Sequence, residues 1–589
     1  MTDPVAKEAM MDLALWAPKA RRVEVVLGGE RRGLERGEDG WWRGAHVEAG
    51  TDYAFSLDDG PPRPDPRSRW QPYGVHRASR AFVPAAQART ATTFRAPPLG
   101  AGLIYELHVG TFSPEGTFDG VAGKLDHLVG LGVTHVELMP VNAFPGQRGW
   151  GYDGVGLYAP HEAYGGPEAL LRLVDACHER GLAVLLDVVY NHLGPDGNYI
   201  GEYGPYFSTR HSTPWGQAVN LDGEGADEVR RFFVDNALYW LRDFGFDGLR
   251  LDAVHALVDQ SALPFLEQLG AEVAALSAAT GRPLVLIAES DLNDPRLVRA
   301  PEAGGFGLDA AWSDDFHHAL HVALTGEKTG YYADFAGVPD VARALRRGYV
   351  YEGQHAAHRG RAHGRPVGEL PATRLVGYAQ THDQVGNRAR GERLAHLAGP
   401  RLAQVGAALV LTAPFVPMLF QGEEWAATAP FQYFTDHESP ELAEAVRRGR
   451  RSEFVAFGWK PEDVPDPQDP ETFARSRLDW TEVEEGAHGE TLKWHKELVA
   501  LRAREPALRD GRLAGVEVAH GERWIEVRRG PVTLIANLGE APVERPRPPG
   551  QRVLANVVGV EERGDKVLVP GTCAAIYVQS RRVCGEGGR

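Results

Sequence analysis

At 589 residues the chain is too long for one core of ordinary size, and we expect two to four domains. A hydrophobic content of 43% and a charged content of 24% describe a folded globular protein and exclude a disordered one. The formal net charge of -17 argues against a nucleic-acid or anionic-membrane surface and favours a neutral or cationic ligand.

The sequence does not predict a secretory signal or a membrane span. Its first residues, MTDPVAKEAM, lack the basic run and apolar core of a secretory signal, and no apolar stretch is long enough to span a membrane. The cysteines Cys177, Cys573 and Cys584 have no zinc-like spacing and suit a reducing compartment, although a Cys573–Cys584 bridge stays open. We therefore predict a cytoplasmic protein that binds neither membrane nor nucleic acid.

The first hundred residues carry short alternating runs, such as RRVEVVL and WWRGAHV, which are separated by Gly, Asp and Pro. This alternation predicts a small antiparallel β-sandwich over residues 1–95. Residues 59–74 are so rich in proline that they must form an extended or turning segment.

From about residue 96 short apolar strands alternate with helical stretches. The predicted strands cover residues 103–109, 134–140, 183–189, 247–253, 283–290, 308–315, 375–382 and 414–421. This repetition predicts a (β/α)8 TIM barrel over residues 96–510, whose strands are continuously apolar because both of their faces are covered.

The end of the chain changes character again. After a final helix at about 491–508, alternating runs such as RWIEVRR and VTLIANL predict a small all-β domain over residues 511–589. The RRGRR run at 447–451 is interpreted as a solvated surface.

The segment GFDGLRLDA, residues 245–253, predicts a strand that ends on an arginine and a carboxylate. Because strand side chains alternate, Arg250 and Asp252 share one side while Leu249 and Leu251 take the other. A carboxylate at the end of a buried strand, oriented by a nearby guanidinium, is what a covalent glycosidase nucleophile requires. For this segment alone a structural Arg–Asp pair explains the pattern equally well.

In such a barrel the active site lies at the carboxyl ends of the strands, so the residues at these ends are decisive. The polar residues there are Asp187, Asn191 and His192 after strand three, Arg250, Asp252 and His255 at strand four, Glu289 at strand five, and His382 and Asp383 at strand seven. Cleavage of a glycosidic bond needs one ionised and one protonated carboxyl group. Asp252 beside Arg250 should stay ionised, whereas Glu289, after the apolar run VLIA, is the better candidate for a raised pKa and the acid role.

The motifs DVVYNH, GFDGLRLDA, IAES and THD resemble, in this order, the four signature regions of the α-amylase superfamily of glycoside hydrolases. The resemblance covers about residues 100–510. It implies that Asp252 is the nucleophile, Glu289 the general acid and base, and Asp383 the carboxylate that stabilises an oxocarbenium-like transition state. The implied reaction retains the α configuration.

The same resemblance assigns supporting roles to other side chains. His192 and His382 would hydrogen-bond the sugar ring that is cleaved, Arg250 would orient Asp252, and Tyr152 in GYDG would stack beneath that ring. One position departs from the pattern, because Thr381 stands where many relatives have asparagine, which puts one contact in doubt.

Metal binding is not predicted. Asn191 matches a residue that helps to bind calcium in many amylases, but no long acidic insertion follows strand three to complete such a site. No cofactor is predicted either.

Five blocks, at residues 64–79, 213–223, 312–335, 381–388 and 418–438, are similar to the maltooligosyltrehalose trehalohydrolases within this superfamily. This similarity implies hydrolysis of the α-1,4 bond next to the terminal trehalose of a maltooligosyltrehalose, and a carbohydrate-binding-like N-terminal sandwich. It also implies a functional link to a maltooligosyltrehalose synthase, which makes the substrate, but a stable complex with that synthase does not follow from it.

The resemblance also predicts the residues that contact the sugar. Besides those named above, they are Asp153, Trp215, His255, Asp314, Asp315, His317, His318, Gln384, Asp436 and His437. For the residues outside the strand ends, packing or capping is an equally good explanation.

Two alternatives stay open. One is a branching or debranching enzyme that acts at α-1,6 bonds of a related α-glucan, and the other is a glucan-binding protein without catalytic activity. The intact set of Asp252, Glu289 and Asp383 argues against the second.

Overall fold

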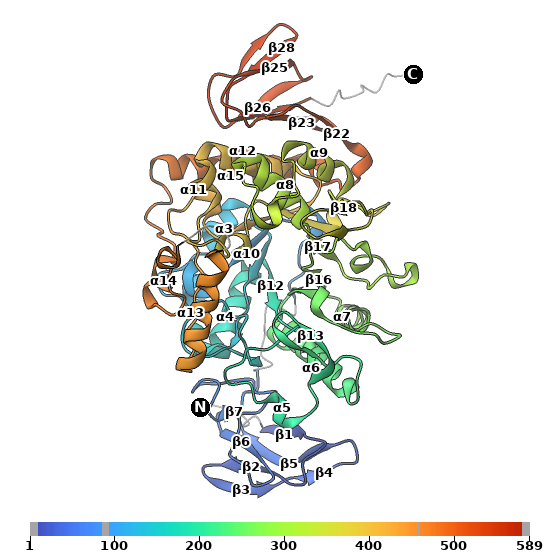
Figure 1. Ribbon diagram of the computed structural model, residues 1–589, viewed down its shortest axis with the longest axis vertical. Helices are drawn as coiled ribbons and strands as arrows, with labels where there is room; N and C mark the ends of the chain where they lie inside the picture. Colours follow the sequence, from blue (N-terminus) through green and yellow to red (C-terminus); the bar gives the residue numbers. More distant parts are fainter. Residues whose placement is uncertain (1–9, 85–92, 456–459, 580–589) are drawn as a thin grey trace, which may run out of the picture.

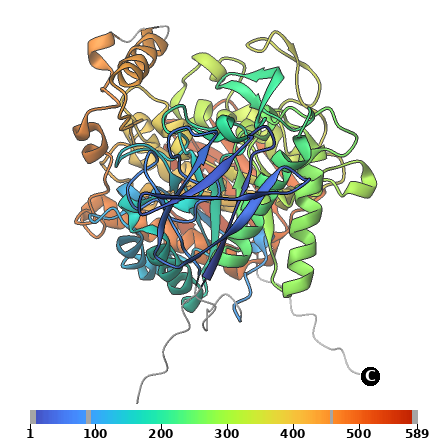
Figure 2. The same cartoon turned by 90° about the horizontal axis from the view of Figure 1, so that it is seen from below.

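The computed structural model describes residues 10–84, 93–455 and 460–579. Figure 1 shows three parts stacked along the long axis, with the first strands at one end, a barrel in the middle and the last strands at the other end. Seen from below in Figure 2, the N-terminal sheets, in blue, lie across the barrel.

The alternating runs at the start of the chain form two antiparallel sheets, with strand orders β1-β5-β4 and β3-β2-β6-β7. Their inward residues, such as Leu15, Val25 and Phe55, are buried, and the predicted sandwich is confirmed. The strands are β1 Met10–Trp16, β2 Val23–Leu27, β3 Glu30–Gly33, β4 Glu35–Arg36, β5 Trp41–Glu48, β6 Asp52–Leu57 and β7 Ser79–Arg80.

Eight parallel strands close into a barrel in the order in which they follow along the chain, which confirms the predicted fold. Each lies within one of the predicted apolar runs. They are β8 Ile104–Leu107, β9 His135–Leu138, β12 Ala183–Val188, β15 Gly248–Leu251, β16 Val285–Ala288, β17 Ala310–Trp312, β20 Leu375–Tyr378 and β21 Val416–Phe420.

Helices surround the barrel and cover its strands with apolar stripes. In α4, for example, Leu170, Leu173, Val174 and Cys177 are buried at helical spacing. The helices are α1 Val109–Phe112, α2 Phe118–Ala122, α3 Leu125–Leu131, α4 Gly166–Glu179, α5 Ile200–Tyr203, α6 Ala226–Tyr239, α7 Phe265–Thr280, α8 Asp314–Thr325, α9 Val338–Arg347, α10 His382–Gly386, α11 Leu394–Ala398, α12 Pro400–Thr412, α13 Pro440–Val455, α14 Pro470–Arg475 and α15 Gly486–Arg504. Among the residues described, no helix has the length and apolar character needed to cross a membrane.

Short hairpins are inserted between the barrel elements. They pair β10 Asn142–Ala143 with β11 Gly156–Pro160, β13 Phe207–Thr213 with β14 Gly216–Val219, and β18 His355–Ala356 with β19 Arg361–Ala362.

The C-terminal strands form a five-stranded sheet, β22-β23-β24-β29-β26, and a three-stranded sheet, β25-β28-β27, which confirms the all-β prediction. Cys573 is buried and free, while Cys584 lies outside the described residues. The strands are β22 Val516–His520, β23 Trp524–Arg529, β24 Val532–Asn537, β25 Val543–Pro546, β26 Gln551–Ala555, β27 Glu561–Arg563, β28 Lys566–Val569 and β29 Cys573–Val578.

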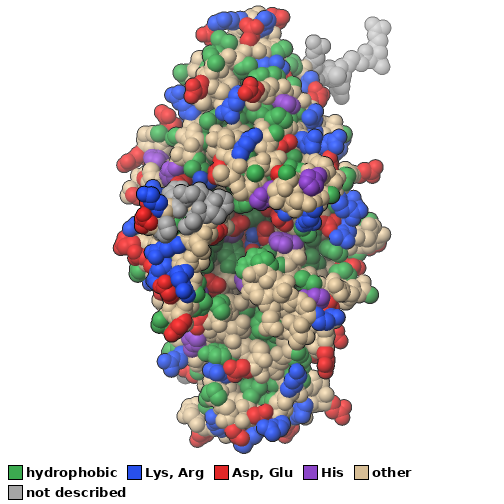
Figure 3. All heavy atoms as spheres, viewed as in Figure 1, with side chains coloured by type: hydrophobic (Ala, Val, Ile, Leu, Met, Phe, Trp, Pro, Cys, Tyr) green, Lys and Arg blue, Asp and Glu red, His purple; other side chains and the backbone are tan. Residues whose placement is uncertain are grey.

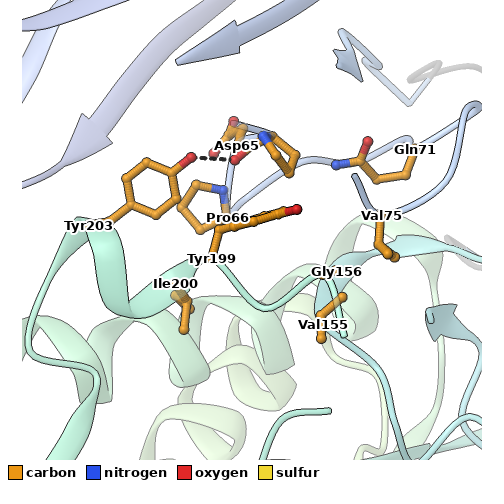
Figure 4. A pocket seen from close by; sticks show the side chains of 11 residues that line it. Asp65, Pro66, Gln71, Val75, Val155, Gly156, Tyr199, Ile200 and Tyr203 are labelled. Atoms are coloured by element: carbon orange, nitrogen blue, oxygen red, sulfur yellow. Dashed lines mark hydrogen bonds between the residues drawn. The ribbon is translucent and has the colours of Figure 1, made fainter. Parts of the chain in front are cut away.

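The proline-rich segment of the N-terminal part packs against the chain that follows strand β12 (Figure 4). Tyr203 donates a hydrogen bond from its hydroxyl to the carbonyl oxygen of Pro64 at 2.6 Å. The Tyr199 hydroxyl lies 2.6 Å from His76 Nδ1, and the Arg63 guanidinium lies 4.1 Å from the centroid of the Tyr199 ring. The segment between β6 and β7 therefore contacts the chain that follows β12, which begins at the cleft described below.

The interpretation of the RRGRR run as a solvated surface is wrong for one residue. The run lies on α13, where the Arg448 side chain is 73% exposed but the Arg450 side chain is only 8% exposed. Residues two apart on a helix point in directions about 200° apart, so the run cannot keep all of its side chains in solvent when one face packs.

Candidate active site

A cleft opens where the barrel strands end. It lies at mid-height of the face seen in Figure 3, where acidic side chains gather in a hollow with histidines at its rim. Its lining residues are Trp150, Tyr152, Asp153, His192, Trp215, Arg250, Asp252, Ala253, His255, Glu289, Asp291, Asp314, His318, Tyr331, Arg359, His382, Asp383, Gln384, Asn387 and Tyr433.

One arginine links three carboxyl groups at the end of strand β15. Arg250 donates from Nη1 to Asp252 Oδ1 at 2.8 Å and to the two carboxylate oxygens of Asp187 at 2.8 and 2.9 Å. Arg250 Nη2 lies 3.7 Å from Glu289 Oε2. Because the guanidinium is only 2% exposed, its charge acts on these groups with little screening by water.

The backbone just after Asp252 binds the second carboxyl group. Ala253 has φ of 40° and ψ of 51°, a left-handed conformation that is uncommon for a residue other than glycine. In this conformation its N–H donates to Glu289 Oε2 at 2.6 Å. Asn191 Nδ2 donates to Asp252 Oδ2 at 3.1 Å, so both carboxyl groups are oriented by fixed donors.

The electrostatic surroundings separate the roles of the carboxyl groups. Burial raises the pKa of Glu289 well above its usual range, Arg250 opposes this shift, and the neighbouring Asp252 adds to it. Burial also raises the pKa of Asp383, against the opposing effect of His382. Of these two groups only Glu289 has its pKa raised well above the usual range, which is the property that a general acid needs.

A chain of hydrogen bonds crosses the base of the cleft from strand β8 to Asp187. Glu106 contacts His382 twice, through Nδ1 and through the backbone N–H, the latter at 2.9 Å. His382 Nε2 lies 2.8 Å from the Tyr152 hydroxyl, which in turn donates to Asp187 Oδ2 at 2.6 Å. Arg250 then connects Asp187 to Asp252, so the chain reaches the candidate nucleophile.

The direction of these bonds requires a charged imidazole. The single proton of the Tyr152 hydroxyl is donated to Asp187, so its oxygen must accept from His382 Nε2, and Nδ1 must donate to Glu106. Burial works against this charge, but Glu106 and Asp383 together oppose burial and the pKa of His382 is raised. Sequence reasoning missed Glu106, although a charged residue inside the apolar run LIYELHV is the signal that marks it.

The threonine that departs from the family pattern has a structural task. The Thr381 hydroxyl accepts from the backbone N–H of Asp383 at 3.2 Å and so caps the N-terminus of α10. It also bonds to Gln384. The cap that orients His382 and Asp383 is therefore present without asparagine.

Comparison with known proteins identifies the family. Two family models match, the alpha amylase catalytic domain over residues 80–211 and a domain of unknown function (DUF3459) over residues 511–577. A malto-oligosyltrehalose trehalohydrolase from Arthrobacter ramosus is 51% identical over 568 residues, which are 95% of this chain and 96% of the relative. The chain belongs to the malto-oligosyltrehalose trehalohydrolase family.

This membership confirms the resemblance that the motifs indicated and makes the chain a glycoside hydrolase with an α-glucan substrate. A solved structure from Salmonella typhimurium, provisionally described as an alpha amylase, is 36% identical with a TM-score of 0.89 and covers 98% of this chain and 99% of its own. A 1,4-alpha-glucan branching enzyme from Mycolicibacterium paratuberculosis is 31% identical over 353 residues, only 52% of this chain and 48% of the relative. The match to the trehalohydrolase family is therefore much more extensive.

Most of the predicted site residues meet in the cleft. The structure places there Asp252, Glu289, Asp383, Tyr152, Asp153, His192, Arg250, His255, His382, Trp215, Asp314, His318 and Gln384. Trp215 is 50% exposed and stacks on His192 with ring centroids 5.2 Å apart and planes at 9°. An exposed flat ring of this kind at the rim suits a sugar face.

The structure does not bring four other predicted residues to the lining of this cleft. Asp315 and His317 are buried beneath it in α8, where Asp315 accepts hydrogen bonds from the backbone N–H groups of Val350 and Tyr351, both at 2.8 Å. Asp436 pairs with Arg148 at 2.6 Å, and His437 lies 3.8 Å from Asp153. These last two therefore pair with residues of the loop between β10 and β11.

The cleft also contains residues that sequence reasoning missed. They are Trp150, Ala253, Asp291, Tyr331, Arg359, Asn387 and Tyr433. Arg359 and Asp291 form an ion pair at 2.9 Å across two loops. No motif of the sequence joins Arg359 to Asp291, because they come from two different loops and only the fold brings them together.

Proposed function

We propose that this chain hydrolyses the α-1,4 bond adjacent to the terminal trehalose of a maltooligosyltrehalose and releases trehalose. The observation that carries the proposal is the near-complete match to relatives described as malto-oligosyltrehalose trehalohydrolases, 42 to 51% identical over 87 to 95% of the chain. The cleft supports it, because Asp252, Glu289 and Asp383 line one cavity at the strand ends.

In the first step, Asp252 attacks the anomeric carbon of the glucose on the non-trehalose side, and a covalent ester forms. Glu289 donates its proton to the O4 oxygen of the trehalose unit as the α-1,4 bond breaks. The raised pKa of Glu289 suits this donation. Arg250 and Asn191 hold Asp252 by both carboxylate oxygens, so its orientation is set before substrate arrives.

In the second step, Glu289 is ionised and takes a proton from a water molecule. The oxygen of this water attacks the anomeric carbon and the ester with Asp252 breaks, so that Glu289 is protonated again. Two inversions retain the α configuration in the shortened maltooligosaccharide. Asp383 and the imidazolium of His382 would bind ring hydroxyls of the distorted sugar, with the Tyr152 ring beneath it.

The trehalose unit requires a different set of contacts. Its α,α-1,1 linkage gives it a bent, non-reducing shape, so recognition needs polar groups and a flat ring on the leaving-group side. We assign this side to Asp314, His318 and Gln384, with Trp215 at the rim. Burial raises the pKa of Asp314 to about 7, so this group can both accept and donate hydrogen bonds near neutral pH.

The test is product analysis with a purified maltooligosyltrehalose. Wild-type protein should release free trehalose and a maltooligosaccharide with an initially α-configured reducing end, as followed by NMR, and D252N should release neither. Release of no trehalose by the wild type, together with altered iodine staining of amylose, would identify a branching or debranching enzyme instead. Binding of the substrate without cleavage of any glucan would favour the non-catalytic alternative.

The place of the chain in the cell follows from the substrate. Because the trehalose end must be formed before it is released, a synthase that acts on a maltooligosaccharide has to supply the substrate, and both proteins belong in the cytoplasm. For the layout of the chain we assign three units, residues 1–95, 96–510 and 511–589.

A further inference from the structure

Helix α10 is a five-residue helix that presents His382 and Asp383 to the cleft from its first turn. So short a helix satisfies few of its own backbone groups, and both ends need partners. At the N-terminus the partners are Thr381 and Glu106. At the C-terminus, the carbonyl oxygen of Gly386 accepts a hydrogen bond from Arg450 Nη2 at 2.6 Å.

Arg450 comes from α13, a helix that lies beside the barrel in Figure 1. Its side chain is only 8% exposed, and its guanidinium lies 5.1 Å from the centroid of the Tyr433 ring, which lines the cleft. A buried arginine is costly unless its donors are used. Besides Gly386, its partners are Asn387 Oδ1 and Glu453 Oε2, both at 3.3 Å from Nη1.

The contact with Asn387 has a chemical consequence for Asp383. A guanidinium has donors only, so the atom of the Asn387 amide that faces it must be the oxygen. The amide NH2 group then faces Asp383 and donates to Oδ1 at 2.5 Å. If the amide turned over, its oxygen would face the carboxylate instead and the two groups would repel each other.

We propose that Arg450 is a positioning residue for Asp383. It acts in two ways, by capping the C-terminus of α10 and by fixing the orientation of the Asn387 amide. The inference rests on the proposed function, in which Asp383 acts on the transition state. It assigns α13 a part in the reaction although none of the described side chains of α13 lines the cleft.

The first experiment compares R450M with R448M. Methionine keeps an apolar stem of similar length and removes all donors, and Arg448 lies on the same helix with a 73% exposed side chain. For R450M we expect kcat to fall about tenfold with KM changed less than about threefold, because a misplaced Asp383 weakens transition-state contacts more than substrate binding. R448M should match the wild type. An R450M protein with unchanged thermal unfolding and with kcat within about twofold of the wild type would overturn the proposal.

The second experiment is a double-mutant cycle with N387A. If Arg450 acts through the amide, R450M should lower kcat much less in the N387A background than in the wild type. An equal loss in both backgrounds would show that Arg450 does not act through Asn387. If R450M does not fold, R450K takes its place. Lysine keeps the charge but cannot bind Gly386 and Asn387 with a planar fork, so we expect kcat of R450K to fall about three- to tenfold below the wild type. Full activity of R450K would also contradict the proposal.

The Arg450 experiments and the test of the proposed function can fail independently of each other. The trehalose assay on the wild type tests the reaction, whereas the Arg450 comparison is made relative to the wild type. If the wild type cleaved only a plain maltooligosaccharide, the same variants would be measured on that substrate.

Discussion

The rim at strands β12, β15 and β16 differs from the rim at helix α8 in how its charges are held. At the strand rim the charged side chains form one network of ion pairs, in which Arg250 contacts Asp187, Asp252 and Glu289. On α8 two adjacent aspartates, Asp314 and Asp315, have different roles. Asp314 lines the cleft and bonds to the Tyr378 hydroxyl, whereas Asp315 anchors the backbone of another loop.

This difference predicts different responses to substitution. At the strand rim one change should disturb catalysis through a connected network, with little effect on folding. On α8 the effects on catalysis and on stability should fall on different residues. The first three of the following measurements, from the largest expected effect to the smallest, test this contrast, and the fourth gives a reference at a residue outside both rims.

D252N should lower kcat about 10⁴-fold or more, because the amide is a far weaker nucleophile than the carboxylate. Residual trehalose release is measured over long incubations, with thermal unfolding as the control for folding. If the purified variant kept more than a few per cent of wild-type activity, Asp252 would not be the nucleophile.

E106Q should lower kcat about 10- to 100-fold, since it removes the charge that keeps His382 protonated. Glu106 raises the pKa of His382, so replacement of Glu106 by glutamine should lower the pKa of His382. The charged imidazole then disappears at a lower pH. As the pH rises, kcat of E106Q should therefore begin to fall at a lower pH than kcat of the wild type. If the alkaline side of the pH profile of kcat is the same in E106Q and in the wild type, Glu106 does not control the protonation of His382.

The pair D314N and D315N tests the separation on α8. D315N places an amide against the backbone N–H groups of Val350 and Tyr351, and should lower the free energy of unfolding by about 2 kcal/mol with kcat nearly unchanged. D314N should change KM for maltooligosyltrehalose about three- to tenfold with a smaller loss of stability. Reversed effects would show that the two residues have been assigned to the wrong sides of the helix.

D436N should have the smallest effect. The pair between Asp436 and Arg148 is partly exposed, with side chains 25% and 23% accessible, and such pairs contribute below about 1 kcal/mol. Denaturant unfolding should show a loss in this range, and the kinetic constants should stay within about twofold. A large rise in KM would mean that Asp436 contacts the sugar, as sequence reasoning suggested.

Sequence reasoning succeeded where the fold restricts the outcome. Strand side chains alternate, and the carboxyl ends of all barrel strands meet on one rim, so the sequence alone predicts that Asp252, Glu289 and Asp383 lie together. On α8 no such restriction applies. Asp314 and Asp315 are equally polar, and the direction of each depends on how the helix packs.

Two residues were beyond the reach of local patterns. Glu106 matters because closure of the barrel brings strand β8 within hydrogen-bond reach of His382, which follows strand β20 and lies 276 residues further along the chain. Arg450 sits in a run of arginines that is typical of a surface, and only the packing of α13 selects this one for burial. Both depend on contacts between elements that are distant in sequence.

By itself, the sequence determined the (β/α)8 barrel between two β domains and the candidate carboxyl groups at its strand ends, because strand periodicity and strand-end position are local properties. The tertiary structure decided which side chains hold those groups. Long-range hydrogen bonds, which no short stretch of chain contains, determine three features of the site. They are the charge on His382, the orientation of the Asn387 amide and the position of Asp315 outside the cleft.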